Sequence, residues 1–194
     1  QKTWDIKDND RMNEWLQLEK QCNECKKCSL WENRKNVVIG RGNKTAAFML
    51  IGEAPGEEED IQGRAFVGRA GQLLSMALSA MGIEEDNYYI CNIIKCRPKN
   101  NRTPYEQEIQ ECLPYLDRQI ELVQPEVIVL LGNTAAASLI DKNIRITQQR
   151  GTWHEYKGIP VMLTYHPAAL LRDESKKIDM WRDLKNAWKR LQTA

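Results

Sequence analysis

The residues of this sequence with the clearest chemical potential are its six cysteines. Three of them fall within the short stretch CNECKKC, which holds two overlapping CxxC spacings. No secretory signal pattern precedes this stretch, so metal or cluster ligation is favoured over disulfide bonds. Four thiolates can close a zinc site or hold an iron–sulfur cluster, and the spacing leaves these two and free thiols open. The six are Cys22, Cys25, Cys28, Cys91, Cys96 and Cys112.

A second concentration of unusual residues is the stretch GEAPGEEEDIQGRAFVGRAGQLL, residues 52–74. A glycine- and proline-rich turn opens it, a run of acids follows, and one aromatic, Phe66, stands between glycines. Glycine and proline at these positions permit a sharp turn and a close approach of a ligand to the backbone. A glycine-flanked loop is also an unexpected place for a core aromatic residue. The stretch is therefore typical of a binding loop.

These residues need a scaffold, and the hydrophobic pattern predicts one. Short β-rich runs alternate with amphipathic stretches, and two strands are expected about the Lys-Gly turn within 152–165. Strands separated by helices predict a three-layer α/β/α sandwich with a central, mostly parallel four-stranded sheet, built as one domain over residues 1–194. The other expected strands are 48–52, 88–94 and 126–132, and the expected helices are 12–20, 103–123 and 181–191.

In such a sheet, ligands bind beyond the carboxyl ends of the strands. Three loops follow predicted strands: the stretch 52–74, CNIIKCRP at 91–98 and YHPAALLR at 165–172. We therefore expect these three loops to converge on one site.

The segment 103–123 is a long helical pattern. Thr103 is suited to the N-cap and Pro104 to the first helical position. Pro114 lies inside the pattern and should kink or split the helix, because proline removes a backbone donor.

Charge and hydropathy narrow the class of protein. The net charge is +1 with 28% charged residues, so any polyanion must bind a local patch and not a uniformly basic surface. No apolar stretch approaches the length needed to span a bilayer. We expect a soluble, cytoplasmic protein with no membrane partner.

The motifs GEAPGEEEDIQGRAFVGRAGQLL, CNIIKCRP and YHPAALLR, in that order and after a CxxC, resemble the iron–sulfur uracil-DNA glycosylases, the fourth family of that superfamily. The resemblance runs from about Cys25 to Arg172. It implies a DNA-repair enzyme that flips uracil out of DNA and hydrolyses its N-glycosidic bond. It also implies a 4Fe-4S cluster; Cys22 is an alternative in the first CxxC pair, and the implied ligands are Cys25, Cys28, Cys96 and Cys112.

The resemblance also assigns roles to residues on the three loops. A flipped base needs a flat apolar surface and a polar reader of its edge, which Phe66 and Asn92 provide. Asn92 can accept from uracil N3–H and donate to O4, a pairing that cytosine mismatches. His166 resembles the histidine that donates to uracil O2 as negative charge develops there.

The acids of the first loop are assigned to the sugar and to the base edge. In the best-known branch of the superfamily an aspartate activates the water, whereas Ala54 stands at that place here. By resemblance Glu53 lies beside the sugar and the water, and Glu59 crowds the C5 edge, where thymine carries its methyl group. Gly52 allows the ligand to approach closely.

DNA attachment is expected from basic residues in or beside the same loops, through phosphate contacts. Leu170 or Leu171 is expected to fill the gap left by the flipped nucleotide. The partner is uracil-containing DNA, single- or double-stranded, and the protein is expected to be a monomer. A non-catalytic iron–sulfur relative that binds DNA or uracil is the alternative. The basic residues are Arg64, Arg69, Lys95, Arg97, Lys99, Arg102 and Arg172.

Overall fold

The computed structural model describes residues 2–193, and the side chains of residues 8–192. Its centre is a six-stranded sheet in the order β1-β3-β2-β4-β6-β5. The strands are β1 (Arg41–Gly42), β2 (Phe48–Gly52), β3 (Tyr88–Asn92), β4 (Val127–Leu131), β5 (Trp153–Tyr156) and β6 (Ile159–Thr164). The longer helices are α1 (Lys2–Asn23), α3 (Arg69–Ala80), α4 (Glu106–Val123) and α8 (Lys177–Thr193). The shorter ones are α2 (Glu57–Gln62), α5 (Asn133–Leu139), α6 (Ile146–Gln149) and α7 (Pro167–Arg172).

The predicted α/β sandwich is confirmed, and its strand count is corrected. Strands β3, β2, β4 and β6 are parallel neighbours, while β1 and β5 add one antiparallel edge strand each. The count of four leaves out these two edges. Strand β5 was expected as one of the two strands about the Lys-Gly turn, whereas β1 was not expected, because its two residues are too few for a hydrophobic pattern.

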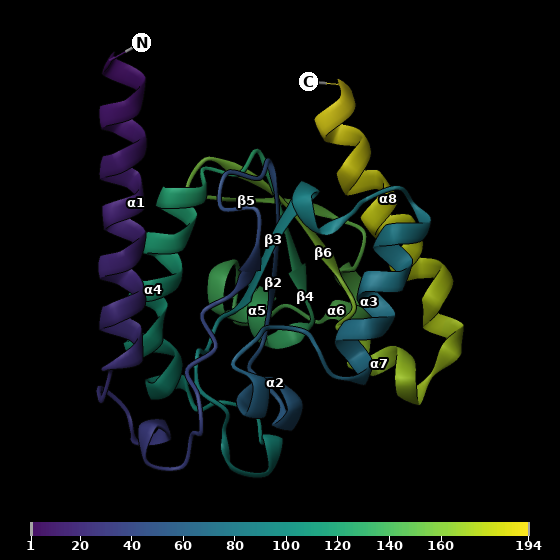
Figure 1. Ribbon diagram of the computed structural model, residues 1–194. Helices are drawn as coiled ribbons and strands as arrows, with labels where there is room; N and C mark the ends of the chain where they lie inside the picture. Colours follow the sequence, from purple (N-terminus) through teal and green to yellow (C-terminus); the bar gives the residue numbers. More distant parts are fainter. Residues whose placement is uncertain (1, 194) are drawn as a thin grey trace.

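Helices cover both faces of the sheet, as Figure 1 shows with α1 and α4 on one side and α3 and α8 on the other. Successive residues of a strand point to opposite faces. Met49 and Ile51 therefore pack in the core under α1 and α4, whereas Phe48 and Leu50 pack in the core under α3 and α8. Both faces of the central strands are buried, which explains their nearly continuous apolar sequences.

Helix α4 differs from its prediction at its start and at its proline. It begins at Glu106 with Tyr105 as the N-cap residue, and Glu108 accepts from the Tyr105 backbone N–H at 2.8 Å. It also continues through Pro114 without being split. Pro114 and Gln110 are both exposed, so water can hydrate the carbonyl that the proline leaves without a donor.

The parallel strands bring their carboxyl ends to one edge of the sheet, the edge where α2 lies in Figure 1. This edge carries the loops that the sequence singled out. None of the helices within residues 2–193 is long and apolar enough to cross a membrane.

Candidate active site and cysteine pocket

A cleft of about 870 Å³ opens at the carboxyl ends of the parallel strands. All three predicted loops reach it, through Glu53 and Phe66 after β2, Asn92 at the end of β3, and His166 after β6. The loop after β4 lines it as well, from Leu131 to Thr134. That fourth loop was missed by sequence reasoning, although polar Asn133 and Thr134 directly after a strand were the signal that could have found it.

Phe66 is held in the wall of the cleft by close backbone contacts. Its side chain is buried, and its φ is +55°, which is uncommon for a residue other than glycine. A Cβ atom on Gly52 would lie 2.5 Å from Phe66 Cζ, and one on Gly71 would lie 2.1 Å from the Phe66 carbonyl oxygen. Both positions therefore require glycine. The Phe66 ring lies 6.0 Å from the His166 ring, centre to centre.

Asn92 presents a buried acceptor beside this aromatic ring. The residue is 2% exposed, and within the described chain its Oδ1 has no hydrogen-bond partner. A Cβ atom on Gly52 would lie 2.7 Å from that oxygen, so the strand end passes directly beneath it. A buried acceptor without a donor is destabilising. A ligand with an N–H group could satisfy it.

His166 has a defined tautomer and charge. It is the N-cap residue of α7, and its Nδ1 accepts from the Ala168 backbone N–H at 3.1 Å. Because Nδ1 accepts, the proton of the neutral ring is on Nε2. Burial, together with the smaller effect of the positive charge of Arg172, lowers the pKa of His166 from 6.5 to about 4. At neutral pH, His166 is therefore an uncharged donor through Nε2–H.

Glu53 is fixed from across the cleft. The hydroxyl of Thr134 donates to Glu53 Oε2 at 2.7 Å, which joins the loop after β2 to the start of α5. The Glu53 carbonyl accepts from the Ile94 backbone N–H at 3.1 Å. Both the side chain and the backbone of Glu53 are thus held in place. Thr134 is a site residue that the sequence did not single out.

Glu59 also lines the cleft, but its carboxylate is engaged by the backbone. Oε1 accepts from the Gly56 N–H at 3.1 Å, and Oε2 accepts from the N–H groups of Val67 and Gly68 at 2.8 and 2.6 Å. These bonds cap α2 and tie it to the loop that carries Phe66. The geometry gives the Glu59 carboxylate a positioning task, and its expected place at the base edge stays a prediction.

Only some of the basic residues expected to contact DNA line the cleft. Arg172 and Arg102 line the cleft, whereas Arg64 and Arg97 are not among its lining residues. Arg64 forms an ion pair with Glu85 at 3.6 Å. Arg97 donates to Asn101, which does line the cleft, at 2.7 Å.

Two further residues that were expected to contact DNA are buried. Leu170 is 1% exposed because it packs in the core under α3 and α8, whereas its neighbour Leu171 is 45% exposed. Lys95 is also 1% exposed, and its Nζ donates to the Asn92 carbonyl at 2.6 Å. Neither position carries a local sign of burial, since both fall in loops predicted to face the ligand.

A separate pocket beside α1 and α4 collects five of the six cysteines, and apolar Leu30, Ile94 and Trp31 also line it. We call it the cysteine pocket. Its cysteines come from the end of α1 and the following turn, the loop after β3, and α4. Arg34 donates to Cys96 Sγ at 3.4 Å and to the Cys25 carbonyl at 2.8 Å. The five are Cys22, Cys25, Cys28, Cys96 and Cys112.

Burial disfavours charge on these thiols. It raises the pKa of Cys22 and Cys112 to about 12 and raises the pKa of Cys28 and Cys96 as well. Thiolates in this pocket therefore need a positive partner. Cys91 is buried outside the cysteine pocket, in contact with Lys95.

Comparison with known proteins agrees with the resemblance drawn from the motifs. Residues 39–192 match the uracil DNA glycosylase superfamily model. A type-4 uracil-DNA glycosylase of Thermotoga maritima is 47% identical over 157 residues, which covers 80% of this chain and 82% of the relative. A type-4 uracil-DNA glycosylase of Sulfurisphaera tokodaii is 46% identical over 170 residues, covering 83% and 77%. A type-5 uracil-DNA glycosylase of Pyrobaculum aerophilum is 30% identical over 158 residues, covering 72% and 69%. The chain therefore belongs to the uracil-DNA glycosylase superfamily and, at this identity and coverage, to its type-4 family.

Proposed function

We propose that this protein is a DNA-repair glycosylase that flips uracil out of DNA and hydrolyses its N-glycosidic bond, leaving an abasic site. The observation that carries the proposal is the buried, unpaired Oδ1 of Asn92, which faces the same cleft as the Phe66 ring and His166. A flat surface, an unsatisfied acceptor and a neutral donor in one cleft match the chemistry of a flipped pyrimidine.

Asn92 selects the base in this proposal. Its Oδ1 accepts from uracil N3–H, and its amide N–H donates to uracil O4. Cytosine presents an acceptor at N3 and a donor at N4, so both pairings would be mismatched and the buried Oδ1 would stay unpaired. Such polar mismatches discriminate more strongly than differences in size. Phe66 stacks on the base and holds its edge against Asn92.

His166 stabilises the leaving group. As the bond between uracil N1 and sugar C1′ breaks, its electron pair passes to the base and charge develops on O2. A preorganised Nε2–H donor aimed at that oxygen stabilises the transition state more than the ground state, with an effect of about 3 to 4 kcal/mol. The neutral ring suits this role, since it donates without needing to titrate.

Glu53 acts on the sugar side. The departing base leaves an oxocarbenium-like sugar, which a nearby carboxylate stabilises. Water adds to C1′, Glu53 accepts the proton that the water loses, and the uracil anion is protonated from solvent. Thr134 fixes the carboxylate for this task, and Ala54 beside it supplies no acid of its own. Gly52 leaves room for the base, and Glu59 holds the Phe66 loop.

Uracil-containing DNA, single- or double-stranded, is bound by phosphate contacts at the mouth of the cleft. Arg172 is positioned for this contact, because it is the last residue of α7 and lines the cleft. Arg64 and Arg97 lie farther out and serve as peripheral contacts. Since Leu170 is buried, the exposed Leu171 takes over the role of filling the gap left by the flipped nucleotide.

A 4Fe-4S cluster is proposed for the cysteine pocket. Within residues 2–193, no three His, Cys, Asp or Glu side chains lie close enough together to hold a single metal ion, although five cysteines line one pocket. Zinc draws its thiolates onto one ion at about 2.3 Å, whereas a 4Fe-4S cluster takes one thiolate on each iron. A spread set of cysteines fits the cluster. The proposed ligands are Cys25, Cys28, Cys96 and Cys112, with Cys22 as a buried neighbour.

When bound, the cluster supplies a link between three chain segments, and none of the chemical steps above passes through it. The remaining expectations concern the whole molecule: residues 1–194 form one domain that acts as a monomer in the cytoplasm. Size-exclusion chromatography with light scattering, with and without DNA, tests the monomer.

Single-turnover release of the base from an oligonucleotide tests the proposed activity. The wild-type protein should release uracil and leave an abasic site, while matched oligonucleotides with cytosine or thymine at the same position stay intact. A non-catalytic relative would instead retain the uracil-containing strand and release nothing. That outcome would overturn the proposal.

A further inference from the structure

We propose that Arg41 is a positioning residue that holds the Phe66 loop in its base-stacking conformation, opposite Glu59. The inference rests on the proposed function, because it gives Phe66 the stacking role described above. Arg41 lies on the edge strand β1, outside every motif that carried the family resemblance, and it does not line the cleft.

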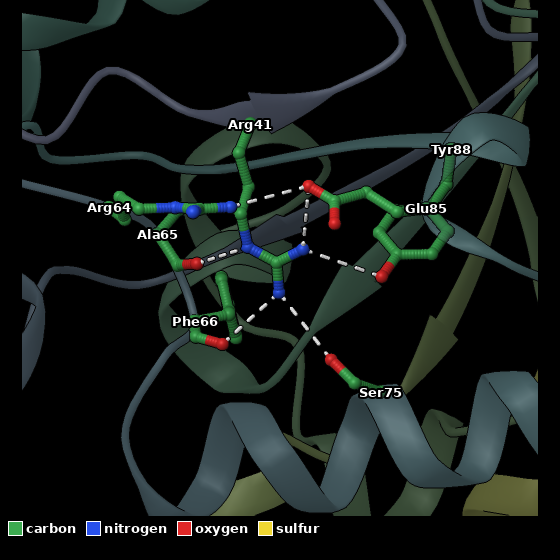
Figure 2. A network of polar contacts seen from close by, with 7 residues as sticks. All are labelled: Arg41, Arg64, Ala65, Phe66, Ser75, Glu85 and Tyr88. Carbon is green, nitrogen blue, oxygen red and sulfur yellow. Dashed lines mark hydrogen bonds and ion pairs between the residues drawn. The ribbon is translucent and has the colours of Figure 1, made fainter.

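The guanidinium of Arg41 donates hydrogen bonds to two consecutive carbonyl groups of the loop. Nε donates to the Ala65 carbonyl at 2.6 Å, and Nη2 donates to the Phe66 carbonyl at 3.2 Å. Figure 2 shows the guanidinium enclosed between these carbonyls and the side chains of Ser75, Glu85 and Tyr88. The Arg41 side chain is 12% exposed, so its bonds are largely shielded from water.

The group that Arg41 holds is in an uncommon backbone conformation. Phe66 has a φ of +55°, which an ordinary side chain adopts only where its surroundings stabilise it. A Cβ atom on Gly71 would lie 2.1 Å from the Phe66 carbonyl oxygen, so α3 passes directly against this peptide group. The bonds to Arg41 satisfy carbonyls that this turn leaves outside regular structure.

The opposite charge binds the next two backbone N–H groups, and the first of them belongs to the same peptide group as the Phe66 carbonyl. Glu59 accepts from the N–H groups of Val67 and Gly68 at 2.8 and 2.6 Å. A cation therefore binds the carbonyls of residues 65 and 66, and an anion binds the amides of residues 67 and 68. The two charges stabilise the turn from both sides and leave the Phe66 ring between Gly52 and His166.

The backbone of Arg41 is itself held in the sheet. Arg41 is paired with Ile90 of β3, the strand that ends at Asn92, so the strand that carries Arg41 is hydrogen-bonded to the strand that carries the base reader. Preorganisation of this kind stabilises the transition state by avoiding rearrangement when the base enters. Loss of Arg41 should therefore slow uracil release at saturating enzyme more than it weakens DNA binding.

A double-mutant cycle tests this role. Arg41→Gln should slow saturated single-turnover release by roughly tenfold, and Arg41→Lys should give an intermediate loss because an ammonium cannot span two carbonyls in the same fork. In a Phe66→Ala background, Arg41→Gln should have almost no further effect on the rate, since the ring it positions is gone. Tyr88→Phe removes another Arg41 contact, at 3.5 Å, and should leave the rate near that of the wild type.

Equal rate losses from Arg41→Gln in both backgrounds would overturn the proposal, because they would place its effect outside Phe66.

Amide hydrogen exchange in the absence of DNA supplies an independent measurement. Arg41→Gln or Arg41→Lys should speed exchange at Val67 and Gly68 but not in β2. Unchanged exchange at these amides would also contradict the role of Arg41 in holding the Phe66 loop. If the wild type released no uracil, the proposed function would fail, while the exchange measurement would still decide whether Arg41 holds the loop.

Discussion

The cleft and the cysteine pocket are two functional regions built on different principles. In the cleft, polar groups are fixed by hydrogen bonds from the chain itself: Thr134 to Glu53, Ala168 to His166, and three backbone amides to Glu59. In the cysteine pocket, burial raises the pKa of the thiols. The polar groups of the cleft are thus held by the chain itself, whereas the buried thiols of the cysteine pocket need a positive partner, which the proposed cluster would supply.

The two regions share one short segment, which sets how they can influence each other. Asn92 ends β3 in the cleft, and Cys96 lies in the cysteine pocket. Between them, the buried Lys95 donates to the Asn92 carbonyl. Damage to the pocket should therefore act mainly through stability and through this segment, while damage to the cleft should act on chemistry and leave the fold intact.

The largest expected effect is loss of the cluster. Cys112→Ser should lose bound iron and lower the free energy of unfolding by more than about 4 kcal/mol, because a metal-centre ligand is removed from a buried pocket. Iron analysis and thermal unfolding measure this. Cys91→Ser and Cys22→Ser are the matched controls, and both should keep their iron. Retention of full iron by Cys112→Ser would remove this residue from the ligand set.

The next largest effect is on chemistry alone. His166→Ala should slow single-turnover uracil release by roughly a hundredfold or more, because a donor to the developing charge on O2 is lost. Iron content and DNA affinity should stay near their wild-type values, and the melting temperature should fall only slightly, because the cap of the short helix α7 is lost. A variant with weakened DNA affinity and an unchanged release rate would assign this loop to phosphate binding.

The pH dependence of His166 sharpens the same contrast. Its pKa is lowered from 6.5 to about 4, so the neutral donor persists as the pH falls from 7 to 5 and is lost only near 4. The unfolded histidine takes up its proton near its ordinary pKa, before the folded one does. His166 therefore reduces stability progressively as the pH falls between these two values. The ratio of the release rates of the wild type and His166→Ala should fall only as the pH approaches the lowered pKa of about 4. A fall centred near pH 6.5 would contradict a ring that stays neutral at pH 5 to 7.

The smallest effect is expected at the mouth of the cleft. Arg172→Ala should weaken DNA binding a fewfold and reduce the slope of log affinity against log salt by about 0.9, the contribution of one phosphate contact on duplex DNA. Release at saturating enzyme should stay near that of the wild type. An unchanged salt dependence would show that Arg172 makes no phosphate contact.

Much of this arrangement could be predicted from the sequence, because it depends on local pattern. The apolar runs of β2, β3 and β4 and the order of the loops predicted the central sheet and the convergence of Phe66, Asn92 and His166. These are short-range signals, since a strand and the polar residue that ends it are adjacent in the chain.

What could not be predicted depends on contacts between residues far apart in the chain. The bonds from the amides of Val67 and Gly68 to Glu59 had no signal in the sequence, because these groups meet only once the loop has folded back. Leu170 or Leu171 was expected to fill the gap left by the flipped nucleotide, and only the packing of α7 against the core distinguishes the buried Leu170 from the exposed Leu171. Arg41 stands in a strand of two residues and carries no local signal at all.

The central claim is that the unpaired acceptor of Asn92 reads the uracil edge, and single-turnover base release by Asn92→Asp tests it most directly. The substitution replaces the amide donor to O4 with a carboxyl group, so a polar mismatch with uracil is introduced at a buried position. We expect that uracil release falls sharply, that release of cytosine appears, and that iron content is unchanged. Undiminished uracil release by Asn92→Asp would remove Asn92 from the site.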